Sequence, residues 1–331
     1  MTRRSWTAVA LLIVAAAATA LIARHYPEII PGAAVAKKDA VKIAQVGEFF
    51  VYMPLYYAKD RGFFDTENLD IAIINTGGDE KSVAAVISGD ATFGVGDPTF
   101  AAIAGQKGRD VRVVASVLNG VPFWGVAKNP NVPEITSPGQ LKGFTVGTFP
   151  APSTAYTLQA RMFRQGGLEP SIRQAQFGTL LPLLESGQVD IVLELEPNVS
   201  IATSRGAHVV FSMAKHYGQF AMTGVSVSGD TIKNHPDLVR RFVRALDAAV
   251  RHAHANPDDV VVFAEGRFPD LPGGVAKEAA RRMLSSDTFP ATARVSEDGW
   301  RSALELRVQA GEIPNVERGL GFLDNSFSSI E

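Results

Sequence analysis

The 331-residue sequence contains no cysteine, which excludes disulfide bonds, thiolate metal sites, a cysteine nucleophile and a lipid-modified cysteine. It also has no excess of charge of one sign, because 32 lysines and arginines are balanced by 34 acidic residues. A nucleic-acid-binding protein needs a basic surface that neutralises phosphates. We therefore expect no nucleic-acid partner, and we expect a fold that is held together by core packing alone.

Catalytic and metal-binding motifs are missing as well. The chain has no Gly-x-Ser-x-Gly elbow, no His-Glu-x-x-His pair and no phosphate-loop sequence. Among its six histidines, His252 and His254 lie two positions apart on a predicted helix and cannot share one face for a metal. We therefore expect no catalytic residue, no metal site and no cofactor.

Residues 1–39 are set apart by their composition. Arg3 and Arg4 precede the apolar segment Ala8–Ile22, and a positive region followed by an apolar one is the pattern of a secretory signal. The uncharged stretch Ser5–Ala23 around it is only just as long as the roughly 17–25 residues that a bilayer crossing needs, so an uncleaved N-terminal anchor is the alternative. We expect a signal peptide or anchor followed by a linker, and a periplasmic protein that is either free or tethered to the inner membrane.

From residue 40 onward, strand-like and helix-like segments alternate, which indicates βαβ units and parallel sheets covered on both faces. The predicted strands of the first half are Val41–Val46, Leu69–Ile74, Thr92–Val95 and Val111–Val117. Those of the second half are Phe144–Gly147, Arg173–Gln176, Asp190–Leu193 and Val209–Phe211. A further predicted strand, Thr223–Val227, crosses back to the first half, and the rest of the chain is helical.

Both halves carry the same order of signals, namely a Ser-Gly helix end, a strand and an acid-proline helix start. In the first half these are Ser88-Gly89 and Asp97-Pro98, and in the second half Ser186-Gly187 and Glu196-Pro197. One structural plan used twice is the economical explanation, and chance recurrence of glycine and proline turns is the alternative. The pattern therefore predicts two α/β lobes.

Ligands of open α/β sheets bind beyond the carboxyl ends of the strands, where loops lead into helix N-termini. Ser153 and Thr154 stand at such a helix start and offer hydroxyl and backbone N–H groups to an anion. Plain helix capping is the alternative for both. Asp97, directly before Pro98, has the same alternative as an N-cap.

Two glutamates follow a predicted strand of the second half. Glu196 belongs to a residue type that caps helices poorly, so a ligand contact explains a carboxylate at this position better than a cap does. Glu194 alternates with it, so both side chains can face one side of an extended segment. If both enter a cleft, the ligand carries N–H donors or positive charge, and exposure to solvent is the alternative. Tyr52 and Trp124, at other strand ends, can stack on a flat ring or a cation.

The segment Pro54–Phe64, PLYYAKDRGFF, strongly resembles a segment of the periplasmic solute-binding proteins for nitrate, sulfonates, taurine and thiamine-pyrimidine precursors. Further landmarks of that family follow in its order, namely Ser88-Gly89-Asp90, Gly96-Asp97, Leu141-Lys142-Gly143, Leu183–Asp190 and Glu196-Pro197. The resemblance covers about residues 41–263, and these motifs are specific in combination rather than singly.

The resemblance implies the type II periplasmic-binding-protein fold, an α/β fold of two Rossmann-like lobes joined by a two-crossing hinge. Lobe one is then expected at residues 40–123 and 228–331, and lobe two at residues 124–227. Carried over by position, the residues at or beside the interlobe cleft are Tyr52, Asp97, Trp124, Ser153, Thr154, Glu196 and Thr223.

The function that the resemblance implies is that of the substrate-binding component of an ABC importer. Such a protein acts as a monomer, captures a small polar organic solute or an oxyanion, and delivers it to a permease and its ATPase complex. The identity of the solute does not carry over.

Two other functions stay open. A related pyrimidine synthase holds pyridoxal phosphate on a lysine, and Lys59 lies in the similar region. However, no histidine occurs between His25 and His208, and the cysteine cluster of that enzyme is missing. The other alternative is a membrane-anchored ligand-sensing module, which the lack of a second apolar segment before Glu331 disfavours.

Overall fold

The computed structural model describes residues 37–151, 153–286 and 288–328. The predicted signal or anchor and the start of its linker fall in residues 1–36 and therefore lie outside the described residues. Inside the described ranges, no helix combines the length and the hydropathy that a membrane crossing requires.

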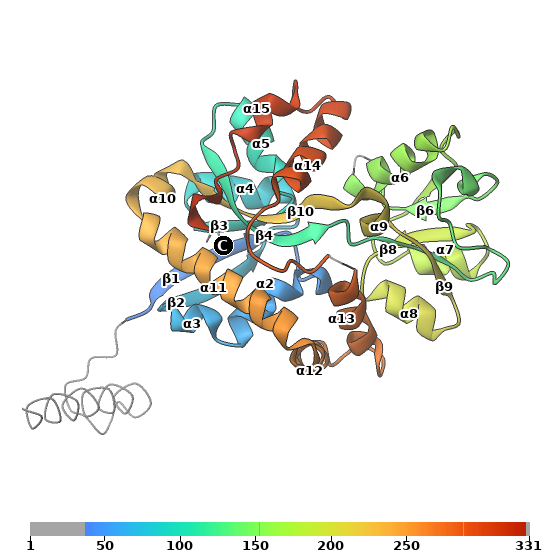
Figure 1. The fold of residues 1–331 in the computed structure, drawn as a ribbon, viewed down its shortest axis with the longest axis horizontal. Helices are drawn as coiled ribbons and strands as arrows, with labels where there is room; N and C mark the ends of the chain where they lie inside the picture. Colours follow the sequence, from blue (N-terminus) through green and yellow to red (C-terminus); the bar gives the residue numbers. More distant parts are fainter. Residues whose placement is uncertain (1–36, 152, 287, 329–331) are drawn as a thin grey trace, which may run out of the picture. The chain divides into compact units, whose positions relative to one another are not determined.

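The first of two five-stranded sheets has the strand order β2-β1-β3-β10-β4 (Figure 1). Its strands are β1 (Asp39–Gln45), β2 (Leu69–Asn75), β3 (Phe93–Gly96), β4 (Val111–Gly120) and β10 (Gln219–Ser228). Strands β1 and β3 are parallel, whereas β10 runs antiparallel to both β3 and β4. The prediction of purely parallel sheets is therefore wrong, because the strand that returns from the second sheet enters the first one in the reverse direction.

The second sheet has the order β7-β6-β8-β5-β9. Its strands are β5 (Trp124–Ala127), β6 (Val146–Thr148), β7 (Ile172–Gln174), β8 (Ile191–Glu194) and β9 (His208–Ser212). Here β6 is parallel to β7 and β8, and β5 is antiparallel to β8 and β9. Strand β5 was not predicted, because its four residues begin only three residues after the long strand β4. Trp124 therefore starts a strand instead of ending a loop.

Helices connect and cover the strands. Those up to the middle of the chain are η2 (Phe50–Tyr52), α2 (Met53–Asp60), α3 (Phe63–Thr66), α4 (Asp79–Ser88), α5 (Thr99–Gln106), η3 (Pro138–Leu141) and α6 (Thr154–Gln165). The next are α7 (Leu180–Glu185), α8 (Asn198–Ser204), α9 (Met213–Tyr217), α10 (Gly229–Asn234) and α11 (Pro236–Ala255). The C-terminal ones are α12 (Pro257–Arg267), α13 (Val275–Ser285), α14 (Glu297–Gln309), α15 (Val316–Leu320) and η4 (Asn325–Phe327).

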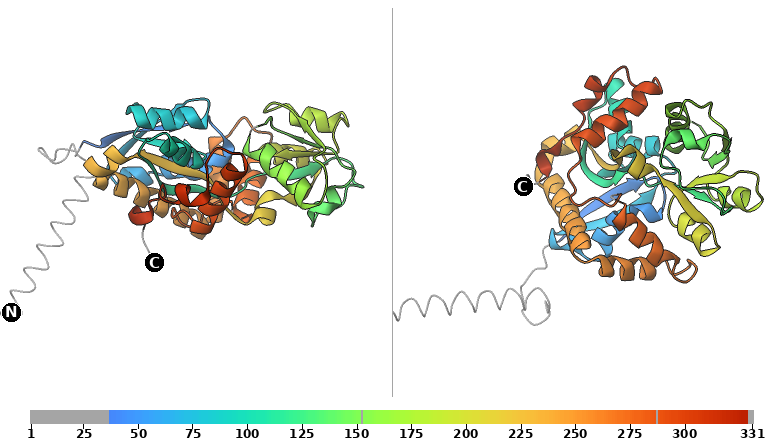
Figure 2. Two further views of the ribbon diagram at one scale, coloured as in Figure 1. Left: turned by 90° about the horizontal axis from the view of Figure 1, so that it is seen from above. Right: turned by 45° about the vertical axis from the view of Figure 1, so that its right-hand side comes forward.

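The chain crosses between the sheets twice. It leaves β4 for β5 through residues 121–123 and returns from β9 to β10 through α9. Gln219 pairs with Gly120 at the first sheet, and Ser212 pairs with Trp124 at the second, so the two crossings run side by side (Figures 1 and 2). The lobe boundaries stay a prediction, with one difference. Because β10 is hydrogen-bonded to β3 and β4, it belongs to the first sheet, whereas a division at residue 227 assigns most of it to lobe two.

The C-terminal helices pack mainly on the first sheet and its helices. Helix α11 lies against α2 and α3, and α14 lies against β10. In the core between them, the ring of Phe242 stacks on those of Phe93 and Phe64, with centroids 4.0 and 4.9 Å away. Helix α13 is different, since it packs both on α12 and on α8 of the second sheet (Figure 1). Side chains of α13 and α14 can therefore reach the region where the two sheets face each other.

Candidate ligand-binding site

Residues predicted at the cleft lie at two facing sheet edges. At the first sheet, Tyr52 ends η2, Asp97 follows β3, and Thr223 lies in β10, one position beyond the pairing of Gly224 with Gly96. This register places Thr223 beside Asp97, and both Tyr52 and Thr223 are buried. The first edge therefore brings together three of the predicted residues.

At the second sheet, Trp124 and Glu194 are paired directly across β5 and β8. Residues paired in this way project from the same face. Thr154 is the first residue of α6 and Ser153 is its N-cap, while Glu196 stands two residues beyond the end of β8. Trp124, Glu194 and Glu196 are all buried.

Asp97 is the centre of a polar network at the first edge. Its Oδ1 accepts hydrogen bonds from the backbone N–H and the hydroxyl of Thr99, at 2.9 and 2.5 Å, so it caps α5. Its Oδ2 lies 2.5 Å from Nη2 of Arg307. Arg307, whose side chain is 7% exposed, also donates to Thr99 and Glu312, both at 2.8 Å. A charge buried to this degree needs such partners.

The network reaches the second sheet through Thr154, whose hydroxyl donates to Oδ2 of Asp97 at 3.3 Å. Across this edge, one side-chain contact therefore joins the N-terminus of α6 to the end of β3.

Asp79 is a second acid at the first edge, and it was not predicted. Its Oδ1 accepts a hydrogen bond from the backbone N–H of Asp97 at 2.7 Å. A Cβ atom on Gly96 would lie 2.2 Å from that oxygen, so only glycine allows this approach. Burial and the nearby charge of Asp97 raise the pKa of Asp79 to about 6. Burial also raises the pKa of Tyr52, and the charges of Asp79 and Asp97 add to this effect.

Glu196 accepts three hydrogen bonds. Its Oε2 accepts from the backbone N–H of Ser200 at 3.0 Å, and its Oε1 accepts from the Ser200 hydroxyl at 2.9 Å and from Nε of Arg282 at 2.7 Å. The argument that Glu196 has no capping role is therefore wrong, because its side chain reaches the first turn of α8. Burial raises the pKa of Glu196, and the charge of Arg282, on α13, opposes this shift.

Glu194 has the opposite surroundings. It is fully buried, yet its Oε1 has no hydrogen-bond partner among the described residues, and its Oε2 accepts a 3.3 Å bond from the backbone N–H of Leu195. Burial raises the pKa of Glu194 to about 7, despite smaller opposing effects of the Asn198 side chain and the Leu195 N–H. Buried polar atoms without partners are rare in native proteins, and they commonly contact a water or a ligand.

Two further polar side chains of the second lobe are buried without a partner in the described structure. Thr148 ends β6, the strand next to β8, and its Oγ1 makes no hydrogen bond. Gln159, in α6, leaves both amide atoms unbonded. Sequence reasoning missed both residues. The position of Thr148 directly after a predicted strand was a usable signal, whereas a glutamine inside a helix gives none. Thr148 thus adds an unbonded hydroxyl at the end of the strand beside β8, and Gln159 adds an unbonded amide within α6.

A chain of aromatic rings borders the same loops. Phe49 contacts Tyr52 and Phe177, with ring centroids 5.6 Å apart in both pairs. Phe149 stacks on Phe177 at 5.8 Å and contacts Phe123 at 6.0 Å. These rings come from the loops after β1, β4, β6 and β7. Phe177 is 52% exposed, so an aromatic surface remains open to a flat ligand.

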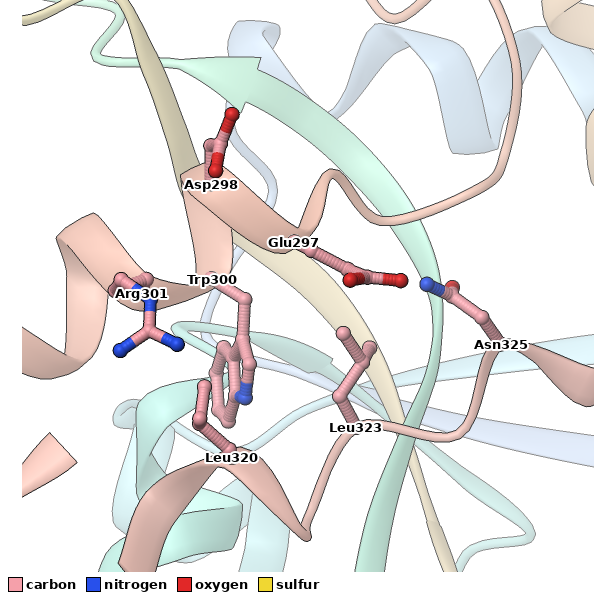
Figure 3. Close-up of a pocket in the computed structure, with 7 residues that line it drawn as sticks. All are labelled: Glu297, Asp298, Trp300, Arg301, Leu320, Leu323 and Asn325. Carbon is pink, nitrogen blue, oxygen red and sulfur yellow. The ribbon is translucent and has the colours of Figure 1, made fainter. Parts of the chain in front are cut away.

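Two cavities differ in their relation to these edges. One of about 620 Å³ is lined by Trp124 and by residues of both crossings and of α13. Another of about 390 Å³ lies among α14, α15 and η4, where Trp300 stands between Leu320 and Leu323 (Figure 3). Because none of the predicted site residues lines the second cavity, we do not assign the ligand to it.

In the described ranges, no group of three or more histidine, cysteine, aspartate or glutamate side chains could hold a metal ion.

The chain forms two mixed sheets that are joined by two side-by-side crossings. Buried polar groups at one of the facing edges lack partners in the described structure. Together these features define the class of two-lobed binding proteins. A family model described as NMT1/THI5 like matches residues 50–260, which is more than half of the chain. The chain therefore belongs to the NMT1/THI5-like family.

Individual relatives agree with this class. The riboflavin-binding protein RibY of Chloroflexus aurantiacus is 27% identical over 246 residues, which cover 72% of this chain and 68% of RibY. The periplasmic nitrate-binding protein NrtA of Synechocystis PCC 6803 matches 88% of this chain and 87% of its own, with a TM-score of 0.67 and 10% identity. The alkanesulfonate-binding protein SsuA of Xanthomonas axonopodis pv. citri, bound to MOPS, matches 88% and 99%, with a TM-score of 0.66 and 14% identity. These two structures show that the fold is that of two-lobed periplasmic binding proteins.

Proposed function

We propose that this chain is the solute-binding component of an ABC importer and captures a small molecule between the facing edges of its two sheets. The observation that carries the proposal is the unmet hydrogen-bonding capacity of Glu194, with Thr148 on the neighbouring strand. A buried group without a partner costs about 1–3 kcal/mol. A bound solute that supplies the partner recovers this free energy, so the edge is better suited to a ligand than to a structural role.

The solute that fits this edge carries N–H or O–H donors beside a flat ring. The protonated carboxyl of Glu194 has one O–H to donate, whereas the ionised carboxylate only accepts hydrogen bonds. A solute donor at the free oxygen therefore binds the ionised form, which predominates above the pKa of about 7. The aromatic chain from Tyr52 to Phe123 offers faces for a ring. An oxyanion at Ser153 and Thr154 is less well supported. The backbone N–H of Tyr156, one of the groups that an anion would use, already donates to Ser153 Oγ at 3.2 Å, and the Thr154 hydroxyl already donates to Asp97.

Binding rather than catalysis is the better supported activity. The relatives described above are named as binding proteins. Lys59, the residue that a cofactor-dependent synthase would use, lies at the end of α2, where its Nζ is 3.7 Å from Asp60 and its side chain is 40% exposed. We therefore propose that the chain acts with a permease and its ATPase complex rather than as an enzyme.

Export by the N-terminal region and monomeric action remain part of this proposal. The division into two lobes is also part of the proposal. The membership of the strands in two sheets supports it, with β10 assigned to lobe one.

Isothermal titration tests the proposal. The panel contains riboflavin, an aminopyrimidine, taurine and nitrate, and native mass spectrometry of protein purified from its own host identifies any further solute. We expect one ligand with a Kd of micromolar or below, equivalent to about −8 kcal/mol. Glu194→Gln should weaken it by about 10-fold to 150-fold, because a hydrogen bond to a charged group contributes about 1.5–3 kcal/mol. Glu185→Gln, an exposed glutamate of the same lobe, is the control. Equal affinity of both variants would remove Glu194 from the site, and the absence of any bound solute would reject the function.

A further inference from the structure

The larger cavity has a chemical character that the Glu194 edge lacks. It measures about 620 Å³ and is lined by parts of both crossings, by α13 and by residues 289–291. We call it the hinge cavity. Its polar lining includes Lys215, Arg282, Asn119 and Gln219, and none of the described residues that line it is acidic. The edges of the two sheets, by contrast, hold Asp79, Asp97, Glu194 and Glu196.

The two cations of the hinge cavity keep unused donors. Arg282 donates through Nε to Glu196, and neither of its Nη groups forms a hydrogen bond with any residue in the described part of the chain. Its side chain is only 24% exposed. Lys215 is the third residue of α9 and is exposed, and within the described residues its Nζ forms no ion pair. A guanidinium with two free Nη groups is suited to bind an oxyanion through both of them.

The neutral amides of the hinge cavity also present donors. The Oδ1 of Asn119 accepts a 2.5 Å hydrogen bond from Ser116, and the Oε1 of Gln219 accepts one from Ser296. With both oxygens occupied, the NH₂ groups are the parts of these side chains that remain for a ligand. Nε2 of His254 lies 3.2 and 3.1 Å from the carbonyl oxygens of Phe289 and Pro290, so this nitrogen is a donor with its acceptors already in place.

Glu196, the one acid among the described residues that contacts Arg282, does not reverse this charge. It is fully buried and uses its Oε1 on the Nε side of the guanidinium, together with Ser200. Glu196 therefore balances the charge of Arg282. The charge of Lys215 is not balanced, so the lining carries a net positive charge. The walls beside the cations include the rings of Trp124 and Phe289, which lower the local dielectric constant and strengthen an ionic contact.

We propose that the hinge cavity is an oxyanion site that binds a carboxylate, sulfonate or phosphate group between Arg282 and Lys215. This proposal goes beyond the capture of a solute at the Glu194 edge, because it rests on different residues and on the opposite charge. The oxyanion is either a free inorganic anion or an acidic substituent of the captured solute, and both share the chemistry that Arg282 and Lys215 recognise.

The test uses the full exported chain, with inorganic phosphate and sulfate as the first probes. Isothermal titration of the wild type should show saturable binding of one anion, and Lys215→Gln should weaken it about tenfold, as expected for the loss of one charged contact. Arg282→Gln should abolish it. Arg282→Gln also removes the partner of the buried Glu196, which destabilises the fold. Lys215→Gln changes an exposed side chain and is therefore the decisive variant. Arg281→Gln, next along α13 and bound only to the exposed Glu278, is the matched control for a general loss of charge.

A second arm separates the two sources of the oxyanion by comparing riboflavin with its 5′-phosphate. If the group belongs to the solute, the phosphorylated compound binds the wild type about tenfold more tightly, and Lys215→Gln removes this advantage. If the anion is free, phosphate binds whether or not Glu194 is replaced by glutamine. That variant therefore distinguishes this site from the proposed solute site. Silence of phosphate, sulfate and the phosphorylated compound, or equal losses in Lys215→Gln and Arg281→Gln, would overturn the proposal.

Discussion

The acid-proline helix starts of the two lobes, Asp97-Pro98 and Glu196-Pro197, have the same structural solution. Each acid accepts hydrogen bonds from the first turn of the helix that follows, α5 or α8. Each also pairs with an arginine of the C-terminal helices, Arg307 of α14 for Asp97 and Arg282 of α13 for Glu196. The symmetry that the sequence suggested is thus a symmetry of capping and ion pairing.

Glu194 differs from these two acids, because it neither caps a helix nor pairs with an arginine in the described structure. It stands at the end of β8 with no arginine beside it, and its Oε1 makes no hydrogen bond with the described residues. The comparison indicates a division of labour, in which the acid-proline positions hold the loops and C-terminal helices in place. The unsatisfied carboxyl beside Trp124 is then the group available to a solute.

The largest effect that this comparison predicts concerns the ion pair of Arg307. Replacing Arg307 with methionine leaves Asp97 buried without its counter-charge, so we expect the free energy of unfolding to fall by about 3–5 kcal/mol. Urea denaturation followed by circular dichroism measures this change. The control is Arg301→Met, on the same helix, where the pair with Glu317 is exposed and contributes about 0–1 kcal/mol. Similar losses in both variants would contradict a structural role that is specific to the Asp97 network.

Whereas Asp97 stabilises the fold through its ion pair, the ionised form of Glu194 should destabilise it, so its effect depends on pH. Its pKa is about 7 in the folded protein against an ordinary value of 4.5. Between these values the unfolded chain has lost the proton and the folded chain still holds it, so stability decreases as the pH rises from about 4.5 to about 7 and is then constant. The shift corresponds to about 3 kcal/mol.

Glu194→Gln removes this pH-dependent loss of stability, because glutamine does not ionise. The variant should therefore gain stability relative to the wild type, by up to about 3 kcal/mol between pH 4.5 and 8. Urea denaturation at a series of pH values measures the difference. A difference that does not change with pH would show that the carboxyl of Glu194 is satisfied in solution, and the contrast with Asp97 would disappear.

Much of the fold could be predicted because its signals are local. Alternating and β-branched segments marked nine of the ten strands found in the described ranges, and glycine stops such as Gly89, with a φ of 83°, marked helix ends. Strand β5 has four residues and no turn residue of its own to announce it. The antiparallel directions of β5 and β10 depend on which strands they meet, and a single sequence does not specify this.

The candidate site remains a prediction, and the sequence indicated its position better than its contacts. The rule that ligands lie beyond strand ends led to Glu194 and Trp124, which face each other across β5 and β8. The same rule could not separate Glu194 from Glu196, because the difference arises from Arg282, 86 residues further along the chain. Arg307 lies 210 residues from Asp97, and nothing near it in the sequence indicates its partner.

Ser153 provides the smallest predicted effect and separates capping from ligand binding. As the N-cap of α6 it accepts a hydrogen bond from the N–H of Tyr156, and loss of such a cap costs about 1 kcal/mol. Ser153→Ala should therefore lower the free energy of unfolding by about that amount and change the affinity for the solute by less than threefold. Ser204→Ala, at the exposed end of α8, is the matched control and should stay within about 0.5 kcal/mol of the wild type. If Ser153→Ala instead reduced the affinity more than tenfold at unchanged stability, the N-terminus of α6 would replace Glu194 as the first contact of the solute. The contrast between the acid-proline positions and Glu194 would then no longer identify the residues that bind the solute.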